Sequence, residues 1–268
     1  LQAEAMVEER CLTGVALLFC LLFAQLSPLA YAEGPAPSLT RQTIPPYFEL
    51  NSGQAEHRVR FIARRADSLL MLADNEAALR FTGRGEAKKD DSRQVTQSES
   101  CKTAGPILMQ FEGRAEGSTP TGIDELPGKS HYLFGKDPAK WVTAARHFRA
   151  VRYGGIYPGI DLIFYNNEQA QLEWDFRVAP GADYRQIRLH FEGTQALSIN
   201  GEDELMLTAE DGSLVRHKLF AYQEGNGQRN KLHAAFWQTG EKDIAFSVEG
   251  QDETLPLVID PILQYSTY

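Results

Sequence analysis

Three carboxylates in the middle of the chain are the residues best suited to chemistry. Glu173 and Asp175 alternate along "QLEWDFRV", which has a hydrophobic period of two, and Asp161 belongs to the preceding segment. Residues two apart in a β-strand share one face and are separated by about 7 Å. A carboxylate pair at a suitable separation is what glycoside hydrolysis requires. The three residues are therefore candidates for a carbohydrate-active or carbohydrate-binding site.

A simpler interpretation fits the same alternation. Glu173 and Asp175 then form the solvated face of an amphipathic hairpin, where Arg177 keeps both carboxylates ionised. The burial of Trp174 distinguishes the two interpretations: if it lies in the core above a flat solvated face, an enzyme has no cleft to work in. We favour this second interpretation and predict a non-enzymatic domain without catalytic residues.

Other chemical motifs are missing from the sequence. It contains no Gly-x-Ser-x-Gly elbow and no dinucleotide fingerprint, and "GKS" at 128–130 lacks the upstream glycine of a phosphate-binding loop. The acidic turns at 200–204 and 210–212 lack the ligand spacing of an EF-hand. No two histidines have the i, i+2 or i, i+4 spacing that directs two imidazoles at one metal. We therefore predict neither a cofactor nor a metal site. The histidines are His57, His131, His147, His190, His217 and His233.

The charge balance argues against one class of partner. Acidic residues outnumber basic residues by 36 to 27, which gives a formal net charge of -9. A chain with this balance has no broad cationic surface with which to neutralise phosphates. Nucleic acid is excluded as an expected partner.

Residues 1–32 have the features of an export signal. The apolar segment 14–26 has signal-peptide length and is short for a membrane span, and Ala30–Ala32 has the small-x-small form of a cleavage site. An uncleaved N-terminal anchor is the alternative. We expect a mature chain that begins at Glu33, has no membrane span, and is periplasmic, extracellular or on the cell surface. Cys101 is then its only cysteine, so no internal disulfide is expected.

The mature chain has the pattern of a mainly β protein. Segments of period two recur from about residue 59 to residue 249, and turn-forming clusters separate them at short spacing. This pattern predicts an antiparallel β-sandwich-like domain with long loops and little helix over 47–261. A Pro-rich lead-in (33–46) precedes it, and the polar segment 83–105 is expected to be an exposed loop.

The alternation also predicts particular core residues and one turn. Pro158 and Gly159 suit the central positions of a type II turn, and Asp161, just beyond it, is expected to accept backbone N–H groups. A proline cannot donate to a ladder, so Pro261 is expected to end the pairing of Leu257–Ile259 and leave Ile262–Tyr268 at an edge or protruding. The predicted core residues are Trp174, Phe176, Leu189, Phe191, Phe236 and Phe246.

Several phrases together resemble a known family. "YPGIDLIFY", "FRVAPGAD" and "LVIDPILQYSTY" occur in the order found in the uncharacterised N-terminal domain of bacterial exported proteins that carry SBBP-type β-propeller repeats. The resemblance covers about residues 47–268. It implies a structural or adhesive module whose partners are downstream propeller repeats, which would start at 262–268, and a surface polymer or protein ligand. Tyr184 and Leu219 stand where the family tends to have proline, so the local turns there can differ.

Overall fold

The computed structural model describes residues 46–65, 68–81, 105–209, 214–225 and 227–266, which belong to one compact unit that starts at Pro45. The expected signal peptide (1–32) lies outside the described residues. So do the lead-in (33–46), except for Pro46, and the polar loop (83–105), except for Gly105. Neither of the two short helical turns in the described part has the length to cross a membrane.

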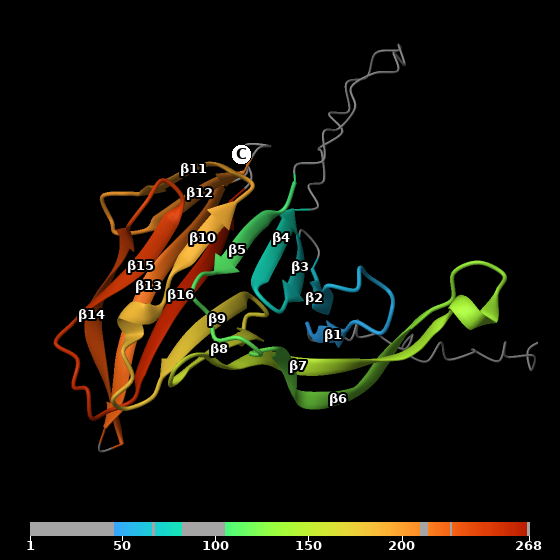
Figure 1. Cartoon of the computed structure of the whole chain (residues 1–268), viewed down its shortest axis with the longest axis horizontal. Helices are drawn as coiled ribbons and strands as arrows, with labels where there is room; N and C mark the ends of the chain where they lie inside the picture. The colour runs from blue at the N-terminus through green and yellow to red at the C-terminus, as the bar shows by residue number, and fades with distance from the viewer. Residues whose placement is uncertain (1–45, 66–67, 82–104, 210–213, 226, 267–268) are drawn as a thin grey trace, which may run out of the picture. The chain divides into compact units, whose positions relative to one another are not determined.

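The described chain is mainly strand, as its alternating sequence predicts (Figure 1). Its two 3₁₀ turns are η1 (Pro138–Lys140) and η2 (Tyr184–Gln186). The strands are β1 (Phe48–Leu50), β2 (Val59–Arg64), β3 (Ser68–Ala73), β4 (Glu76–Phe81), β5 (Ile107–Phe111), β6 (Pro120–Tyr132), β7 (Val142–Tyr157), β8 (Ile160–Asn166), β9 (Leu172–Val178), β10 (Leu189–Glu192), β11 (Thr194–Ile199), β12 (Leu205–Ala209), β13 (Leu214–Gly225), β14 (Gln228–Gln238), β15 (Asp243–Glu249) and β16 (Leu257–Ser266).

All strands belong to one antiparallel sheet that folds back on itself. Its order is β11-β12-β13-β14-β15-β10-β5-β4-β3-β2-β1-β7-β8-β9-β16; β6 pairs with β7 beside this path, and β16 also pairs with β13. Two long strands change partners along one edge: β7 pairs first with β1 and then with β8, and β13 pairs first with β12 and then with β14. The expected sandwich-like packing is therefore made by two faces of a single folded sheet.

The core lies between those facing layers. Phe176 on β9 meets Phe246 on β15 at a ring-centroid distance of 5.8 Å, and Phe61 on β2 meets Phe148 on β7 at 5.7 Å. Edge-to-face pairs of this kind add to the stabilisation from burial. All six predicted core residues are buried, Trp174 with 3% of its surface exposed. Period-two patterning thus identified the inward face correctly.

The β7–β8 turn and its carboxylate confirm the sequence prediction. Gly159 has a φ of +73°, the left-handed value that the second central position of a type II turn requires. Asp161 accepts the N–H of Gly155 at 2.7 Å and binds Arg152 at 2.6 Å. Because these contacts tie β7 to β8, Asp161 has a structural role.

The C-terminal strand corrects one expectation. Ile262–Ser266 is not separated from Leu257–Ile259 at Pro261, because β16 is a single strand that pairs with β13 along its whole length. The pairing with β9 covers only Leu257–Ile259 and stops before the proline. The break that Pro261 was expected to cause therefore occurs on the β9 side alone. Beyond it, β16 has no second strand partner among the described residues, so the expected edge position is confirmed for the part of 262–268 that the structure describes.

Candidate functional site

The carboxylates proposed from the sequence share the face of the sheet that points away from the core, here called the outer face. It is formed by β8, β9, β16, β13 and β14. The register places Asp161 opposite Arg177, and Ile163 opposite Asp175. Phe176 and Ile259 are paired and fully buried, so the next residue of β16, Asp260, points outward near Asp175. The outer face therefore holds a fourth carboxylate that the sequence prediction missed.

The three predicted carboxylates are engaged by different neighbours. Asn167 donates to Glu173 at 2.6 Å, and the Tyr165 hydroxyl donates to Asp175 at 3.0 Å, whereas Asp161 is held by β7. The described residues thus place them on one face without a shared cleft between them. Trp174 packs on the opposite side of β9, in the core.

The expected solvated face is wrong for Glu173 and Asp175. Both side chains are buried, and only 4% of Asp175 is exposed. Burial raises the pKa of Asp175 to about 6, and Arg177, with its guanidinium 4.0 Å from the carboxylate, does not offset this effect. Burial, with the charges of Asp175 and Glu173, raises the pKa of Asp260 to about 7. The alternation shows which side chains point outward, but not how deeply the flanking strands bury them.

Two adjacent hollows lie on the outer face and are together called the outer groove. One has a volume of about 310 Å³ and is lined by Tyr222, Glu224 and Arg229 from β13 and β14; the other, of about 330 Å³, is lined by Gly159 and Asp161. They share Arg177, Val178 and Pro256. The outer groove therefore combines guanidinium donors with carboxylate acceptors.

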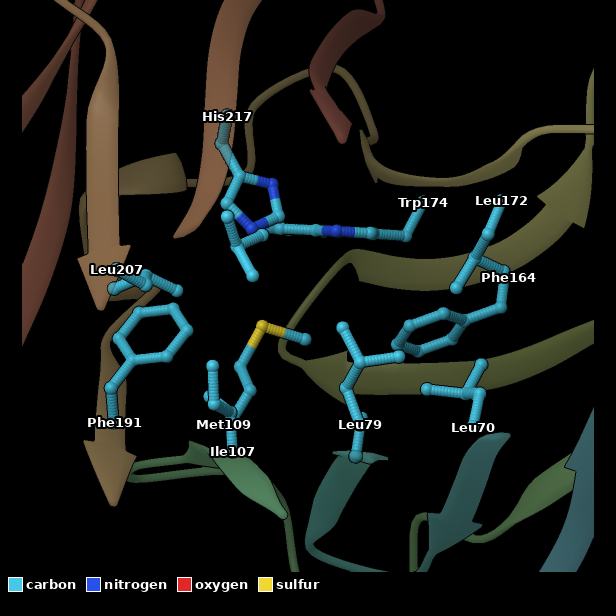
Figure 2. Close-up of a pocket in the computed structure, with 12 residues that line it drawn as sticks. Leu70, Leu79, Ile107, Met109, Phe164, Leu172, Trp174, Phe191, Leu207 and His217 are labelled. Atoms are coloured by element: carbon cyan, nitrogen blue, oxygen red, sulfur yellow. The ribbon is translucent and has the colours of Figure 1, made fainter. Parts of the chain in front are cut away.

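The interior holds a second, apolar cavity of about 40 Å³ (Figure 2). Its walls come from both layers, including Met109 on β5, Trp174 on β9 and His217 on β13. The His217 ring packs edge-to-face on Trp174, and its Nδ1 is buried without a hydrogen-bond partner among the described residues. Burial lowers the pKa of His217 to about 4, so the imidazole is neutral at physiological pH. Because its lining is apolar apart from His217, the cavity lacks the several polar partners that a buried water molecule needs.

A buried polar cluster joins β1 to β6 and β7. Ser130 Oγ lies 2.7 Å from His147 Nε2, and Glu49 Oε2 lies 3.6 Å from the same nitrogen. In a Ser-His-acid triad the acid binds the other ring nitrogen, so this arrangement does not match a triad. Burial alone would raise the pKa of Glu49, but hydrogen bonds from Ser130, Tyr132 and Gln54 outweigh it and lower the pKa. The cluster acts as a tie between strands.

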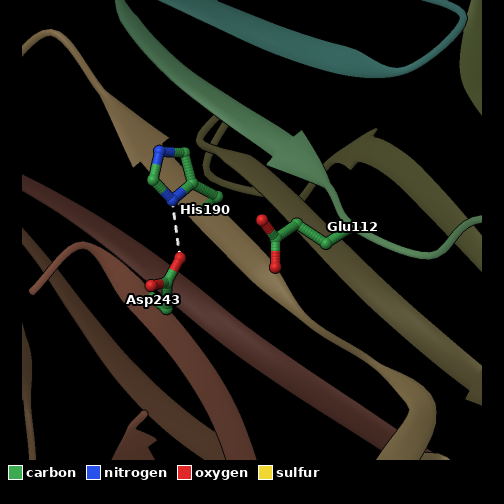
Figure 3. Close-up of side chains that lie close together, drawn as sticks. All are labelled: Glu112, His190 and Asp243. Carbon is green, nitrogen blue, oxygen red and sulfur yellow. Dashed lines mark hydrogen bonds and ion pairs between the residues drawn. The ribbon is translucent and has the colours of Figure 1, made fainter. Parts of the chain in front are cut away.

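One group of three metal-ligating side chains is found in the described part of the chain (Figure 3). Glu112 follows β5, His190 lies on β10 and Asp243 begins β15, and one ligand atom of each lies within 4.8 Å of the others. Sequence spacing gave no signal for this group because its members are far apart along the chain. Strand pairing brings them together: His190 is opposite Asp243, and the Glu112 N–H donates to the backbone carbonyl of Arg188.

Together, the fold and the outer face define an antiparallel β domain with a polar surface groove. The chain belongs to the family described as Domain of unknown function (DUF7948), whose model matches residues 48–262. The match agrees with the resemblance to an uncharacterised domain. No curated protein and no solved structure matches the chain.

Proposed function

We propose that the chain is a non-enzymatic module of an exported, surface-associated protein and that its outer groove binds a neutral surface polysaccharide. The observation that carries the proposal is the mixture of donors and acceptors in the groove. Arg177 and Arg229 supply guanidinium donors, and Glu224, which is paired with Arg229 at 3.0 Å, supplies a carboxylate acceptor. A sugar hydroxyl is both a donor and an acceptor, so it can use both kinds of group.

Charge and size support the same class of ligand. An anionic polymer would meet Glu224 and Asp161 as well as a net charge of -9 over the chain. Volumes of about 310 and 330 Å³ are in the usual range of small-molecule sites. Because the two hollows share Arg177 and Pro256, they suit neighbouring units of one polymer.

The same contacts support a non-enzymatic role. Asp161 and Glu173 are bound to neighbouring strands and turns, and neither Asp175 nor Asp260 lines the outer groove. A glycosidase needs two carboxyl groups on either side of the scissile bond. Asp175, with its raised pKa, is the residue that an alternative carbohydrate-active function would use as an acid.

In this proposal β16 connects the domain to downstream β-propeller repeats. Beyond Ile259 its β9-side edge has no strand partner among the described residues. An unpaired edge can accept a strand from a following segment. The link to propeller repeats comes from the sequence resemblance.

The test is affinity electrophoresis and calorimetry of the purified protein with a panel of neutral and acidic bacterial polysaccharides. Arg177→Ala is the test variant, and Arg58→Ala is its matched control because 58% and 61% of the two side chains are exposed. We expect binding to a neutral polymer that Arg177→Ala weakens at least tenfold and Arg58→Ala leaves unchanged.

Three outcomes would contradict the proposal. If both variants bound the polysaccharide equally well, the binding site would lie elsewhere. If the domain bound only a protein and no polysaccharide, the proposed class of ligand would be wrong. Release of reducing ends that disappears in Asp175→Asn would establish the carbohydrate-active alternative.

A further inference from the structure

The cluster of Glu112, His190 and Asp243 has an internal arrangement that resembles a metal site. Asp243 Oδ1 lies 2.5 Å from His190 Nδ1, and Glu192 Oε1 lies 3.2 Å from His190 Nε2 (Figure 3 shows the Asp243 contact). A metal-binding histidine usually donates its second ring N–H to a carboxylate, which fixes the tautomer and the ring orientation. Glu192 is placed to accept that N–H. The 2.5 Å contact between Nδ1 and Asp243 Oδ1 is a hydrogen bond that Nδ1–H donates, so a metal ion would take the place of this proton.

The charges around His190 are unbalanced. Glu112, Glu192 and Asp243 are three carboxylates around one imidazole. In the described part of the chain, the ion pairs of Glu192 and Asp243 involve His190 alone, and Glu112 has none. Such a concentration of negative charge without a lysine or arginine partner favours a bound cation.

A neighbouring glycine leaves room for the Asp243 side chain. A Cβ atom on Gly240 would lie 2.2 Å from Asp243 Oδ2, so a larger residue there would force the carboxylate to move. The Asp243 carbonyl also accepts the Thr239 N–H at 2.9 Å, which closes the turn before β15. The Asp243 carboxylate occupies the space beside Gly240, and its Oδ1 is directed at His190.

We propose that Glu112, His190 and Asp243 bind a divalent transition-metal ion, with Zn²⁺ as the best fit, and that Glu192 orients His190. One imidazole nitrogen and two carboxylates form a mixed set that suits Zn²⁺ better than Ca²⁺ or Mg²⁺, which prefer oxygen ligands alone. The ion would join β5, β10 and β15. This site is distinct from the outer groove and does not depend on the polysaccharide proposal.

The experiment uses untagged protein that has been treated with a chelator and dialysed. Zn²⁺ is titrated by calorimetry, and Co²⁺ is added separately to record its visible absorption. We expect one Zn²⁺ per chain, a higher Tm with Zn²⁺, and a loss of affinity of at least tenfold in both His190→Ala and Glu112→Gln. Glu112 is exposed, so its variant keeps the test valid if His190→Ala does not fold.

The matched control is His233→Ala. His233 Nδ1 lies 3.9 Å from Glu249 in an exposed pair between β14 and β15, so it offers a histidine and a carboxylate without the third ligand. This control should bind Zn²⁺ as the unaltered protein does. Failure of the unaltered protein to bind Zn²⁺, or equal affinity in the Glu112→Gln variant, would overturn the proposal.

Discussion

At the scale of single residues, burial raises the pKa of Asp260 and lowers the pKa of His217, so the two residues make the stability of the fold depend on pH in opposite directions. The pKa of Asp260 rises from 3.8 to about 7, so its contribution is fully present below pH 3.8 and is lost as the pH rises to 7. The pKa of His217 falls from 6.5 to about 4, so its contribution is present above pH 6.5 and is lost as the pH falls to 4. The two effects oppose each other between about pH 4 and 6.5.

Asp260→Asn should remove the first effect. Asparagine resembles the neutral carboxyl group, so the free energy of unfolding should rise by about 2 kcal/mol at pH 8 and change little at pH 4. Urea unfolding at both pH values measures this change in the free energy of unfolding, with exposed Glu253→Gln as the control. A less stable variant at pH 8 would show that the charged carboxylate is favoured in the fold.

His217→Leu should remove the second effect. It replaces a buried nitrogen that lacks a partner with apolar atoms, so the free energy of unfolding at pH 7 should stay the same or rise. The loss of stability between pH 6.5 and 4 should shrink by up to about 3 kcal/mol, while exposed His233→Leu should leave it unchanged. Strong destabilisation at pH 7 would indicate that a bound molecule satisfies Nδ1.

Two tryptophans offer a matched test of the core. Trp174 is 3% exposed and contacts Phe176 and His217, whereas Trp237 is 65% exposed. Trp174→Ala should lower the free energy of unfolding by about 3–5 kcal/mol, and Trp237→Ala should change it by less than about 0.5 kcal/mol. Chemical denaturation measures both, and similar losses in the two variants would contradict the assigned inward face of β9.

At the scale of elements, the β7–β8 turn depends on a close approach to the η2 segment. A Cβ atom on Gly159 would lie 2.7 Å from Ala182 Cβ, and the backbone there has a φ of +73°. Gly155 has a φ of +58° with no atom near its Cβ position. Gly159→Ala should therefore cost about 2–3 kcal/mol, and Gly155→Ala about 1 kcal/mol, in thermal and urea unfolding. An equal loss of stability in the two variants would mean that the positive φ, and not the contact with Ala182, determines the effect of the substitution at Gly159.

The β16 pairing predicts a graded response to truncation. Deletion of 264–268 removes part of the pairing with β13 and should lower the Tm by a few degrees. Deletion of 256–268 also removes the buried side chains of Leu257 and Ile259 and should unfold the domain, as measured by circular dichroism. A folded protein after the longer deletion would show that β9 and β13 hold together without β16.

At the scale of the whole molecule, the sequence was informative where the cause is local. Alternation placed Trp174 and Phe246 inside, and Pro158-Gly159 identified a turn, because each depends on adjacent residues. The closure of the sheet through β13 and β16 depends on long-range pairing, which no local pattern encodes. For the same reason the sequence predicted neither the burial of Asp175 nor the meeting of Glu112, His190 and Asp243.

The most direct test of the proposed function is hydrogen–deuterium exchange with and without a neutral polysaccharide that the protein binds. The proposal predicts slower exchange at 172–178, 222–229 and 256–258, which border the outer groove, and unchanged exchange in β2–β4. The tip of the β6–β7 hairpin, where Leu133 and Phe134 are exposed, should also be unchanged. Protection at that tip with none at the outer groove would contradict the proposal.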